Sequence, residues 1–344
     1  MRTSIRLIGT GAVALTVLAG CGKHDGTKTT TTEPGTPGAK KITICLLPKA
    51  KGSPYFTSCA EGAANAAKEL GTVNLVYDGP TDGSPEKQAS MIEQWTLQGV
   101  DVIAISPNDP AVLASSMKAA RAKGVKVITW DADCDQSARE FFVNQATAED
   151  IGNALVDTMA KDLGGAQASG DVAIITARLT AANQNAWMEH MKTRLKKYPS
   201  LNLVAVKPSN EDQKLAFQVA QDLMKVYPNL KGLFAISSMA FPAAAEAIRQ
   251  SGKKGQVLVT GLSTPANMKE FVKDGTVKSV ILWNTVDLGY LTICAAEALK
   301  NGSLKAGDTT FNARTLGTKT IAADNILLGK IMVFTSENID QFNF

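Results

Sequence analysis

The sequence predicts an α/β protein made of two Rossmann-like lobes, each a doubly wound parallel sheet, joined by a hinge of several strands. The chain has 344 residues, more than one hydrophobic core usually organises. Its hydrophobic fraction of 44% is sufficient for folded cores. From residue 41 onward, short runs rich in β-branched residues alternate with longer stretches of helical periodicity. That alternation is typical of βαβ units, whose strands form parallel sheets.

The first lobe is predicted from four strands and the helices between them. These strands cover residues 42–47, 73–77, 102–106 and 125–130. Ser84 and Asp109 each precede a proline, a pattern typical of a helix start. Three helices should end at Gly71, Gly99 and Gly124. We therefore expect one parallel sheet with helices between successive strands.

A second series of the same kind follows a strand at 141–143. It contains a helix at 148–163, a spacer rich in Gly, Ala and Ser at 164–170, a strand at 171–176, a helix at 183–198, and strands at 201–206, 232–235, 257–261 and 280–282. The last part of the chain should return to the first lobe. We expect an N-terminal lobe of residues 41–144 and 284–325, and a C-terminal lobe of residues 145–283 and 326–344.

The first 21 residues are predicted to be a lipoprotein signal peptide. Arg2 and Arg6 precede an apolar stretch at 7–18 that is of secretory length and too short for a comfortable membrane span. It ends in Leu18-Ala19-Gly20-Cys21, which resembles a bacterial lipobox and implies lipidation of Cys21. The alternative is an ordinary secretory signal with an incidental cysteine.

Residues 22–40 are expected to be a flexible tether, because residues 22–39 hold no apolar side chain larger than alanine. A lipid and a tether place the folded part at a membrane surface, in the periplasm or at the cell surface. Lysine and arginine number 36 against 32 acidic residues, so removing the two signal arginines lowers the excess from +4 to +2. Such a small excess argues against a nucleic-acid partner.

Four cysteines remain after Cys21, without a Cys-x-x-Cys pair or metal-like spacing: Cys45, Cys59, Cys134 and Cys294. Buried free thiols are the expectation, and disulfides remain an alternative because the protein is predicted to be exported.

Enzyme signatures are largely missing. The two histidines, His24 and His190, suit neither a triad nor a metal site, and the sequence has no Gly-x-Ser-x-Gly elbow, phosphate loop or His-Glu-x-x-His. We expect no catalytic residue, metal or cofactor. A hydrolase using paired carboxylates such as Asp131 and Asp133 remains an alternative.

Polar and aromatic side chains follow the strands of the first lobe, where ligands bind in open parallel sheets. They are Lys49, Tyr55 and Phe56 after the first strand, and Asp131 and Asp133 after the fourth. Carboxylates accept hydrogen bonds from hydroxyls and flat rings pack on C–H faces, so this mixture suits a sugar-like ligand. The alternatives are a turn or capping role for Asp131 and a solvated loop for Lys49.

In the second lobe, Asn183 and Gln184 open a helix directly after the strand at 171–176. These amides could simply cap the helix, but three consecutive carboxamides, ending at Asn185, exceed what a cap requires. The other candidate contacts are Ser238, Phe241, Ser263 and Trp283. Trp283 could instead belong to a core between the lobes, as could Trp187.

Residues 41–344 carry a family likeness in ordered motifs. These are Pro48-Lys49 with Tyr55-Phe56-Thr57, Tyr77-Asp78-Gly79-Pro80-Thr81, Thr129-Trp130-Asp131-Ala132-Asp133, Val143-Asn144-Gln145, Asn183-Gln184-Asn185-Ala186-Trp187, Phe241-Pro242-Ala243-Ala244-Ala245 and Leu282-Trp283-Asn284. On these motifs the chain resembles periplasmic binding proteins of the ribose-binding type, in the branch of autoinducer-2 receptors and rhamnose-binding proteins.

The resemblance implies a two-lobed fold with three crossovers that delivers a sugar-like ligand to the membrane permease of a carbohydrate ABC importer. In the autoinducer-2 receptors, the positions matching Lys49, Asp131 and Gln184 contact ligand. Two departures favour rhamnose or a related sugar over autoinducer-2. Asn183 stands where that pattern has aspartate, and Ile236-Ser237-Ser238 replaces its Pro-x-Ala. A monomer is the default expectation.

Two other functions use the same fold. A sensory receptor would present the bound molecule to a membrane kinase. An intracellular sugar-responsive repressor would carry a helix-turn-helix in place of the predicted signal and tether, so the first 40 residues argue against it.

Overall fold

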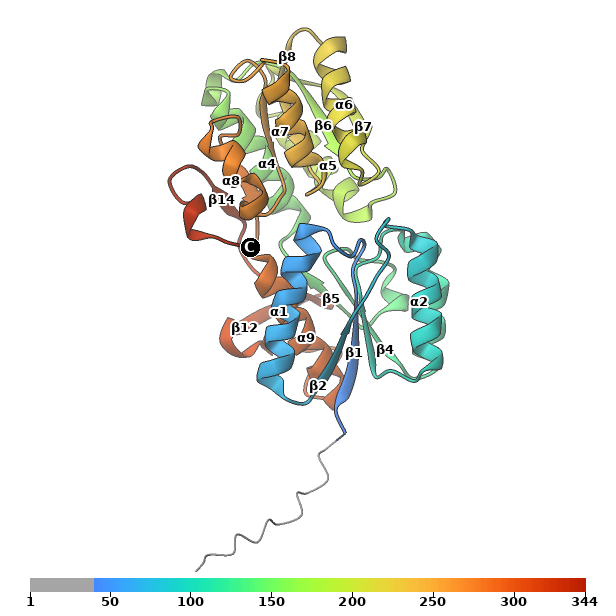
Figure 1. Cartoon of the computed structure of the whole chain (residues 1–344). Coiled ribbons are helices and arrows are strands. Elements are labelled where there is room, and N and C mark those ends of the chain that lie inside the picture. Colours follow the sequence, from blue (N-terminus) through green and yellow to red (C-terminus); the bar gives the residue numbers. More distant parts are fainter. Residues whose placement is uncertain (1–39) are drawn as a thin grey trace, which may run out of the picture. The chain divides into compact units, whose positions relative to one another are not determined.

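The computed structural model describes residues 40–344, so the predicted signal peptide, Cys21 and the tether up to residue 39 lie outside the described residues. The described part contains two lobes, each a sheet covered by helices (Figure 1). The predicted fold class, two Rossmann-like α/β lobes, is confirmed. Within residues 40–344, no helix has the length and apolar character needed to cross a membrane.

The first lobe is built on an eight-stranded sheet. Its strands, in sheet order, are β11 (Thr310–Asn312), β12 (Thr318–Ala322), β13 (Asn325–Leu327), β5 (Phe141–Asn144), β4 (Lys126–Trp130), β3 (Val102–Ile105), β1 (Ile42–Leu47) and β2 (Val73–Tyr77). From β13 to β2 all neighbours are parallel, while β12 pairs antiparallel with both β11 and β13. The helices are α1 (Pro54–Leu70), α2 (Pro85–Leu97), α3 (Pro110–Ala122) and α9 (Thr285–Asn301), with short 3-10 turns η1 (Gln136–Ala138) and η3 (Arg314–Leu316).

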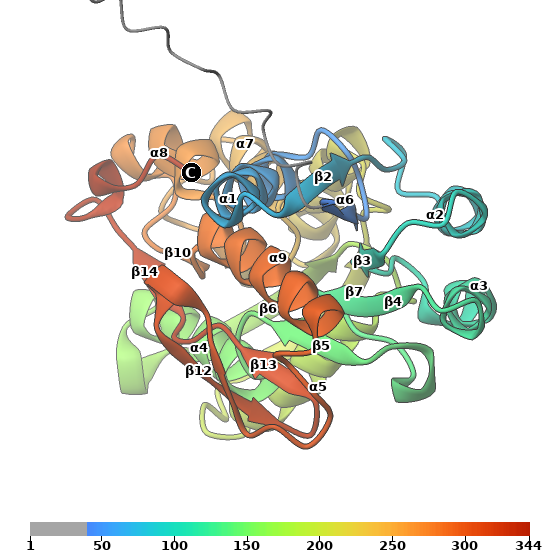
Figure 2. The ribbon, with the colours of Figure 1, turned by 90° about the horizontal axis from the view of Figure 1, so that it is seen from below.

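Alternation along β1 explains why helices cover both faces of this sheet. Ile44 and Leu46 pack with α1 and α9 on one face, whereas Cys45 and Leu47 pack with α2 and α3 on the other. Both sets are fully buried, as expected for a parallel strand inside an α/β lobe. Figure 2 shows α1 and α9 side by side, with α2 and α3 forming a separate pair.

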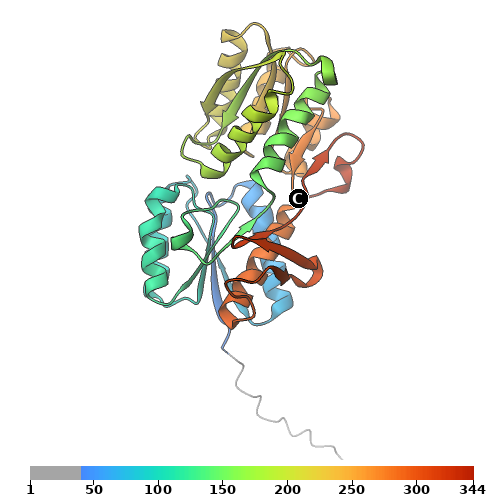
Figure 3. The same cartoon turned by 180° about the vertical axis from the view of Figure 1, so that it is seen from behind.

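The second lobe has a four-stranded parallel sheet in the order β7 (Leu201–Pro208), β6 (Gly170–Thr176), β8 (Leu230–Ala235) and β9 (Leu258–Gly261). Figure 3 shows the two lobes from the side opposite to that of Figure 1. Its helices are α4 (Ala148–Asp162), α5 (Ala182–Leu195), α6 (Gln213–Val226), α7 (Ala240–Gln250) and α8 (Pro265–Lys273), with the 3-10 turn η2 (Gly165–Gln167). Helices α4 and α5 pack as one pair, and α6 and α7 as another.

The chain passes between the lobes three times. It leaves the first sheet after β5, returns after β10 (Val280–Leu282), and leaves again after β13 to form β14 (Met332–Phe334). Strand β14 pairs antiparallel with β10, and the final 3-10 turn η4 (Ile339–Gln341) contacts α8. Three separate passages make the boundary between the lobes a hinge of several strands.

The helix signals in the sequence act as predicted. The Ser84 hydroxyl accepts from the Lys87 amide at 3.2 Å, and the Asp109 carboxylate caps α3. Helix α5 ends at Leu195, earlier than the predicted residue 198. Pro199 explains the shorter helix, because a residue before proline is disfavoured in helical conformation.

The described cysteines are all free thiols, as the sequence indicated. Cys45, Cys59 and Cys294 are buried, while Cys134 is partly exposed. Burial raises the pKa of Cys45 to about 12, and likewise that of Cys294. These two thiols are therefore protonated at neutral pH and poorly reactive.

Helices α1 and α9 approach each other closely because glycines stand at their contact. A side chain at Gly289 would clash with the Cys59 carbonyl, and one at Gly62 would clash with the Val286 carbonyl. The backbones can therefore touch where any larger residue would separate them.

Gly289→Ala should destabilise the fold by at least about 2 kcal/mol, because the new methyl group has no space at the α1 backbone. Urea unfolding followed by circular dichroism measures the change. The control is Asn65→Ala on the exposed face of α1, which should shift the free energy of unfolding by less than about 0.5 kcal/mol. Equal unfolding midpoints for the two variants would contradict the close approach.

Candidate functional site

A cavity lies between the lobes, where the carboxyl ends of strands from both sheets meet. It is lined by Lys49, Tyr55, Phe56, Asp131, Asn183, Gln184, Trp187, Glu211, Ile236, Ser237, Ser238, Leu262, Leu282 and Trp283. The space between these side chains, open solvent included, is about 400 Å³. The strand-end position is the one expected for ligands of open parallel sheets.

Asp131 is the most connected polar group of the cavity. Its carboxylate accepts from the Tyr55 hydroxyl on Oδ1 at 2.8 Å and from the Ser106 hydroxyl on Oδ2 at 2.7 Å. Lys49 Nζ lies 3.3 Å from Oδ2. The residue is 5% exposed, and its backbone has a left-handed φ of 62°. Such a conformation costs on the order of 1–3 kcal/mol and often marks functional sites.

The predicted alternative for Asp131, a turn or capping role, does not describe its side chain. Within residues 40–344, the hydrogen bonds that its carboxylate accepts come from side-chain hydroxyls and not from backbone amides. Its backbone carbonyl accepts from the Gln145 carboxamide at 3.0 Å and from the Asn183 carboxamide at 3.4 Å. Bonds from the residue after β5 and from α5 therefore hold this strained residue in place.

Tyr55 holds the Asp131 carboxylate and is held in turn by Trp283. The Trp283 indole donates to the Tyr55 hydroxyl at 3.0 Å, and that hydroxyl donates to Asp131. Burial, together with the nearby Asp131 charge, raises the pKa of Tyr55, so it stays a neutral donor. The hydroxyl oxygen accepts from the Trp283 indole, so the hydroxyl proton is directed at the Asp131 carboxylate. Tyr55 therefore positions Asp131.

Lys49 connects the two lobes. It is 6% exposed, which excludes a solvated loop lysine. Its ammonium lies beside Asp131 of the first lobe and donates to Asn183 Oδ1 of the second lobe at 3.2 Å. A buried lysine needs such partners, because an unpaired charge away from water is costly.

Asn183 and Gln184 of α5 line the cavity, and Asn183 Oδ1 also accepts from the Gln184 amide in the first turn of the helix at 2.9 Å. Ala181 is the N-cap residue, and no side chain caps at that position. Gln184 Oε1 accepts from the Thr176 hydroxyl at 2.5 Å and from the Ala177 amide at 2.8 Å. These two bonds fix the carboxamide with its oxygen toward β6, so its NH2 group is left as a donor at the cavity.

Glu211 lines the cavity but was not among the predicted site residues. The Ser237 hydroxyl donates to Glu211 Oε2 at 2.8 Å, and burial raises the pKa of the Glu211 carboxyl. Applying the strand-end rule after β7 points to the segment that holds Glu211. The predicted strand ended at residue 206, however, whereas β7 continues to Pro208.

The structure brings eight of the predicted site residues together around the cavity: Lys49, Tyr55, Phe56, Asp131, Asn183, Gln184, Ser238 and Trp283. The other three are not among its lining residues. Asp133 forms a bidentate ion pair with Arg139, at 2.9 and 2.7 Å. Phe241 is fully buried in the core at α7, and the fully buried Ser263 donates to the Ser238 carbonyl at 3.3 Å.

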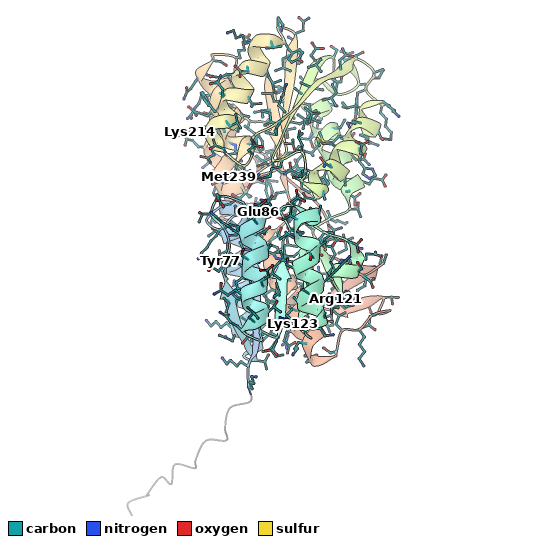
Figure 4. All side chains as sticks on the ribbon, turned by 90° about the vertical axis from the view of Figure 1, so that its right-hand side faces the viewer. Tyr77, Glu86, Arg121, Lys123, Lys214 and Met239 are labelled. Carbon is teal, nitrogen blue, oxygen red and sulfur yellow. The ribbon has the colours of Figure 1, made fainter. Side chains whose placement is uncertain are left out.

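A second, wider opening adjoins the first cavity at the boundary of the lobes. Its lining includes Lys51, Asp82, Glu211, Asp212 and Met239. Figure 4 shows Met239 on the second lobe, on the side that faces the start of α2 in the first lobe. Among residues 40–344, no group of three or more His, Cys, Asp or Glu is arranged to hold a metal ion.

Two α/β lobes with a polar cavity between their strand ends define a two-lobed solute-binding protein. The family model of the periplasmic binding protein domain matches residues 44–304, and the chain belongs to this family. Proteins similar to this chain include a ribose import binding protein and an ABC transporter solute-binding protein with bound L-rhamnose.

Curated relatives and solved structures span most of the chain. The ribose import binding protein of Bacillus subtilis is 25% identical over 274 residues, which cover 78% of this chain and 86% of the relative. A solute-binding protein from Clostridium phytofermentas with bound L-rhamnose is 31% identical, with a TM-score of 0.83 over 88% of this chain and 98% of that one. LsrB from Clostridium saccharobutylicum in complex with AI-2 is 28% identical, with a TM-score of 0.84 over 88% of this chain and all (100%) of that one.

Tyr55→Phe should lower the free energy of unfolding by about 1–3 kcal/mol, because the buried Asp131 carboxylate and Trp283 indole each lose a partner. Urea unfolding measures the effect. Tyr198→Phe is the matched control, since that hydroxyl donates to Asp157 at 2.9 Å in a more exposed ion pair. It should cost less than about 1 kcal/mol. A Tyr55 variant as stable as the control would argue against a positioning role.

Proposed function

We propose that this protein is the substrate-binding lipoprotein of a carbohydrate ABC importer, and that it holds rhamnose or a related deoxyhexose between its lobes. The observation that carries the proposal is the cavity between the lobes. In it, Lys49 contacts Asp131, which also belongs to the first lobe, and Asn183, which belongs to α5 of the second lobe. A hydroxyl-rich molecule there would contact groups fixed on both lobes. The anchor at Cys21, a membrane permease as partner and a monomeric state complete the proposal.

The spare hydrogen-bonding capacity of the cavity suits several hydroxyl groups. An ionised carboxylate has about four acceptor sites, and the Asp131 carboxylate uses two of them for the Tyr55 and Ser106 hydroxyls, while Lys49 Nζ lies 3.3 Å from Oδ2. Lys49 has three donors, two of which face Asp131 and Asn183. Gln184 adds the NH2 group of its carboxamide. Each of these groups can therefore make at least one further bond to a ligand.

The apolar lining favours a deoxyhexose over a fully hydroxylated sugar. Ile236, Leu262 and Leu282 line the same cavity as the polar groups. A methyl group, which a 6-deoxy sugar carries in place of a hydroxyl, would bury there without leaving a polar atom unpaired. Trp187 and Phe56 add aromatic surface for the C–H face of the ring. The similarity to the protein with bound L-rhamnose supports the same ligand class.

Autoinducer-2 is the second candidate ligand, for uptake or sensing. The similarity to LsrB in complex with AI-2 supports it, as do Lys49, Asp131 and Gln184 at matching motif positions. Asn183 argues against it, because a carboxamide replaces the aspartate of that pattern and can donate as well as accept.

Ligand binding would act on the transporter by closing the lobes. A ligand that contacts both lobes binds the closed form more tightly, so it shifts the equilibrium between open and closed forms. A micromolar dissociation constant corresponds to about 8 kcal/mol of binding free energy. A few charge-assisted hydrogen bonds and one or two packed rings can supply that amount after ordering costs.

Asp131→Asn should weaken sugar binding at least about tenfold, because a carboxamide cannot replace a charged acceptor. Asparagine is preferred to alanine here because it tolerates the left-handed backbone of this position. The measurement is calorimetric titration with L-rhamnose, D-ribose, D-allose, D-arabinose and autoinducer-2. A thermal-shift screen of the unmodified protein first selects the members that bind.

The control is Asp135→Asn, which removes an exposed carboxylate four residues away in the same loop. It should leave the dissociation constant within about twofold, since exposed charges act weakly through solvent. An unchanged constant in the Asp131 variant would remove this residue from the site. If none of the five compounds binds, the proposed ligand class is wrong.

A further inference from the structure

Glu211 brings a second carboxylate to the cavity, from the lobe opposite Asp131. It lines both the inner cavity and the wider opening beside it. Ser237 donates to Oε2, and within residues 40–344 no hydrogen bond reaches Oε1. One carboxylate oxygen is thus fixed by the protein, while the other remains available at the cavity.

The loop that carries Glu211 is fixed in an unfavourable backbone conformation. Asn210 and Glu211 are consecutive non-glycine residues with left-handed φ values of 54° and 59°. The loop is tied to the end of β6, because the Asn210 amide donates to the Ala177 carbonyl at 2.7 Å and the Ser209 amide to the Thr176 carbonyl at 2.8 Å. Two such residues in succession cost on the order of 1–3 kcal/mol each, and such strain is concentrated at ligand sites.

The charges of the cavity lining do not balance. Its charged side chains are Lys49, Asp131 and Glu211, so with both carboxylates ionised the sum is −1. Lys49 already faces Asp131 and Asn183. Among the lining residues of this cavity, a ligand bearing a carboxylate or phosphate would find no second cation. A hydroxyl or ammonium group would instead find an acceptor at Glu211.

We infer that Glu211 contacts the ligand and determines specificity, accepting a hydrogen bond from a hydroxyl or ammonium group and excluding anionic sugars. The inference rests on the proposed sugar-binding function and names the charge class of its ligand. Asp131 and Glu211 then bind the same molecule from opposite lobes, so Glu211 also favours closure of the two lobes.

The test compares Glu211→Gln and Glu211→Gly with the unmodified protein by calorimetric titration. The probe is whichever of L-rhamnose, D-ribose, D-allose, D-arabinose and autoinducer-2 binds. Both variants should bind it at least about tenfold more weakly. Glycine accommodates the left-handed backbone without strain, so Glu211→Gly should fold at least as stably as the parent while lacking the carboxylate. A loss of affinity in a stable variant cannot be attributed to unfolding.

The matched control is Asp222→Asn, which removes an exposed charge from α6 of the same lobe, outside the lining of both cavities. Asp222 accepts from the Gln218 carboxamide at 3.0 Å, and an asparagine at this position can accept the same bond. Its affinity for the probe should stay within about twofold of the parent. Equal affinities in the Glu211 variants, the control and the parent would overturn the inference and leave the proposed function intact.

Anionic and cationic sugars give a second readout on the unmodified protein. D-Glucuronate and D-galacturonate should bind at least about a hundredfold more weakly than the best neutral or amino sugar, D-glucosamine and D-galactosamine included. Uronates that bind as tightly as the neutral probe would overturn the inference. Failure of every neutral and amino sugar would instead contradict the proposed function, and the inference with it.

The pH dependence of affinity separates Glu211 from its charged neighbours. Burial raises the pKa of its carboxyl, while Lys49 and Arg178 oppose that rise and Asp131 adds to it. As the pH falls, the carboxylate gains a proton and becomes a weaker acceptor, so affinity for the neutral probe should fall. The neighbouring groups titrate in both proteins, whereas the Glu211 carboxyl titrates only in the parent. The affinity of Glu211→Gln should therefore change less with pH. Parallel profiles would contradict direct contact.

Discussion

The buried Asp131 carboxylate is the group on which the cavity depends. It follows β4 with a left-handed backbone, and that conformation directs it toward Lys49, Tyr55 and Ser106. A buried carboxylate is unfavourable without such partners, so each of them is held as firmly as the carboxylate itself. The strained backbone, the ion pair and the tyrosine hydroxyl therefore form one connected unit.

The passages between the lobes support this unit directly. Trp283 follows β10 at the point where the chain re-enters the first lobe, and its indole donates to Tyr55. Its ring also packs edge-on against Trp187 of the second lobe, with centroids 6.2 Å apart. A residue of the hinge thus contacts groups from both sides of the cavity. The geometry of the cavity is consequently sensitive to the angle between the lobes.

Much of the fold and part of the cavity could be predicted from the sequence, for identifiable reasons. Hydrophobic periodicity locates the strands, and the strand-end rule then selects Lys49 and Asp131. The same rule also selected Phe241, which turns into the core because it lies in the first turn of α7. Glu211 was missed because the predicted strand ended at residue 206, two residues before the end of β7, and because the direction of its side chain depends on the left-handed backbone at Asn210 and Glu211.

The free thiols of the first lobe have a consequence for how the protein can be prepared. Cys45 and Cys59 lie on opposite faces of the central sheet, so the sheet itself keeps these two sulfur atoms apart. The described cysteines form no bridge, so no disulfide contributes to the fold of residues 40–344. Assembly of this part of the chain needs no oxidation step, and reducing agents leave its architecture unchanged.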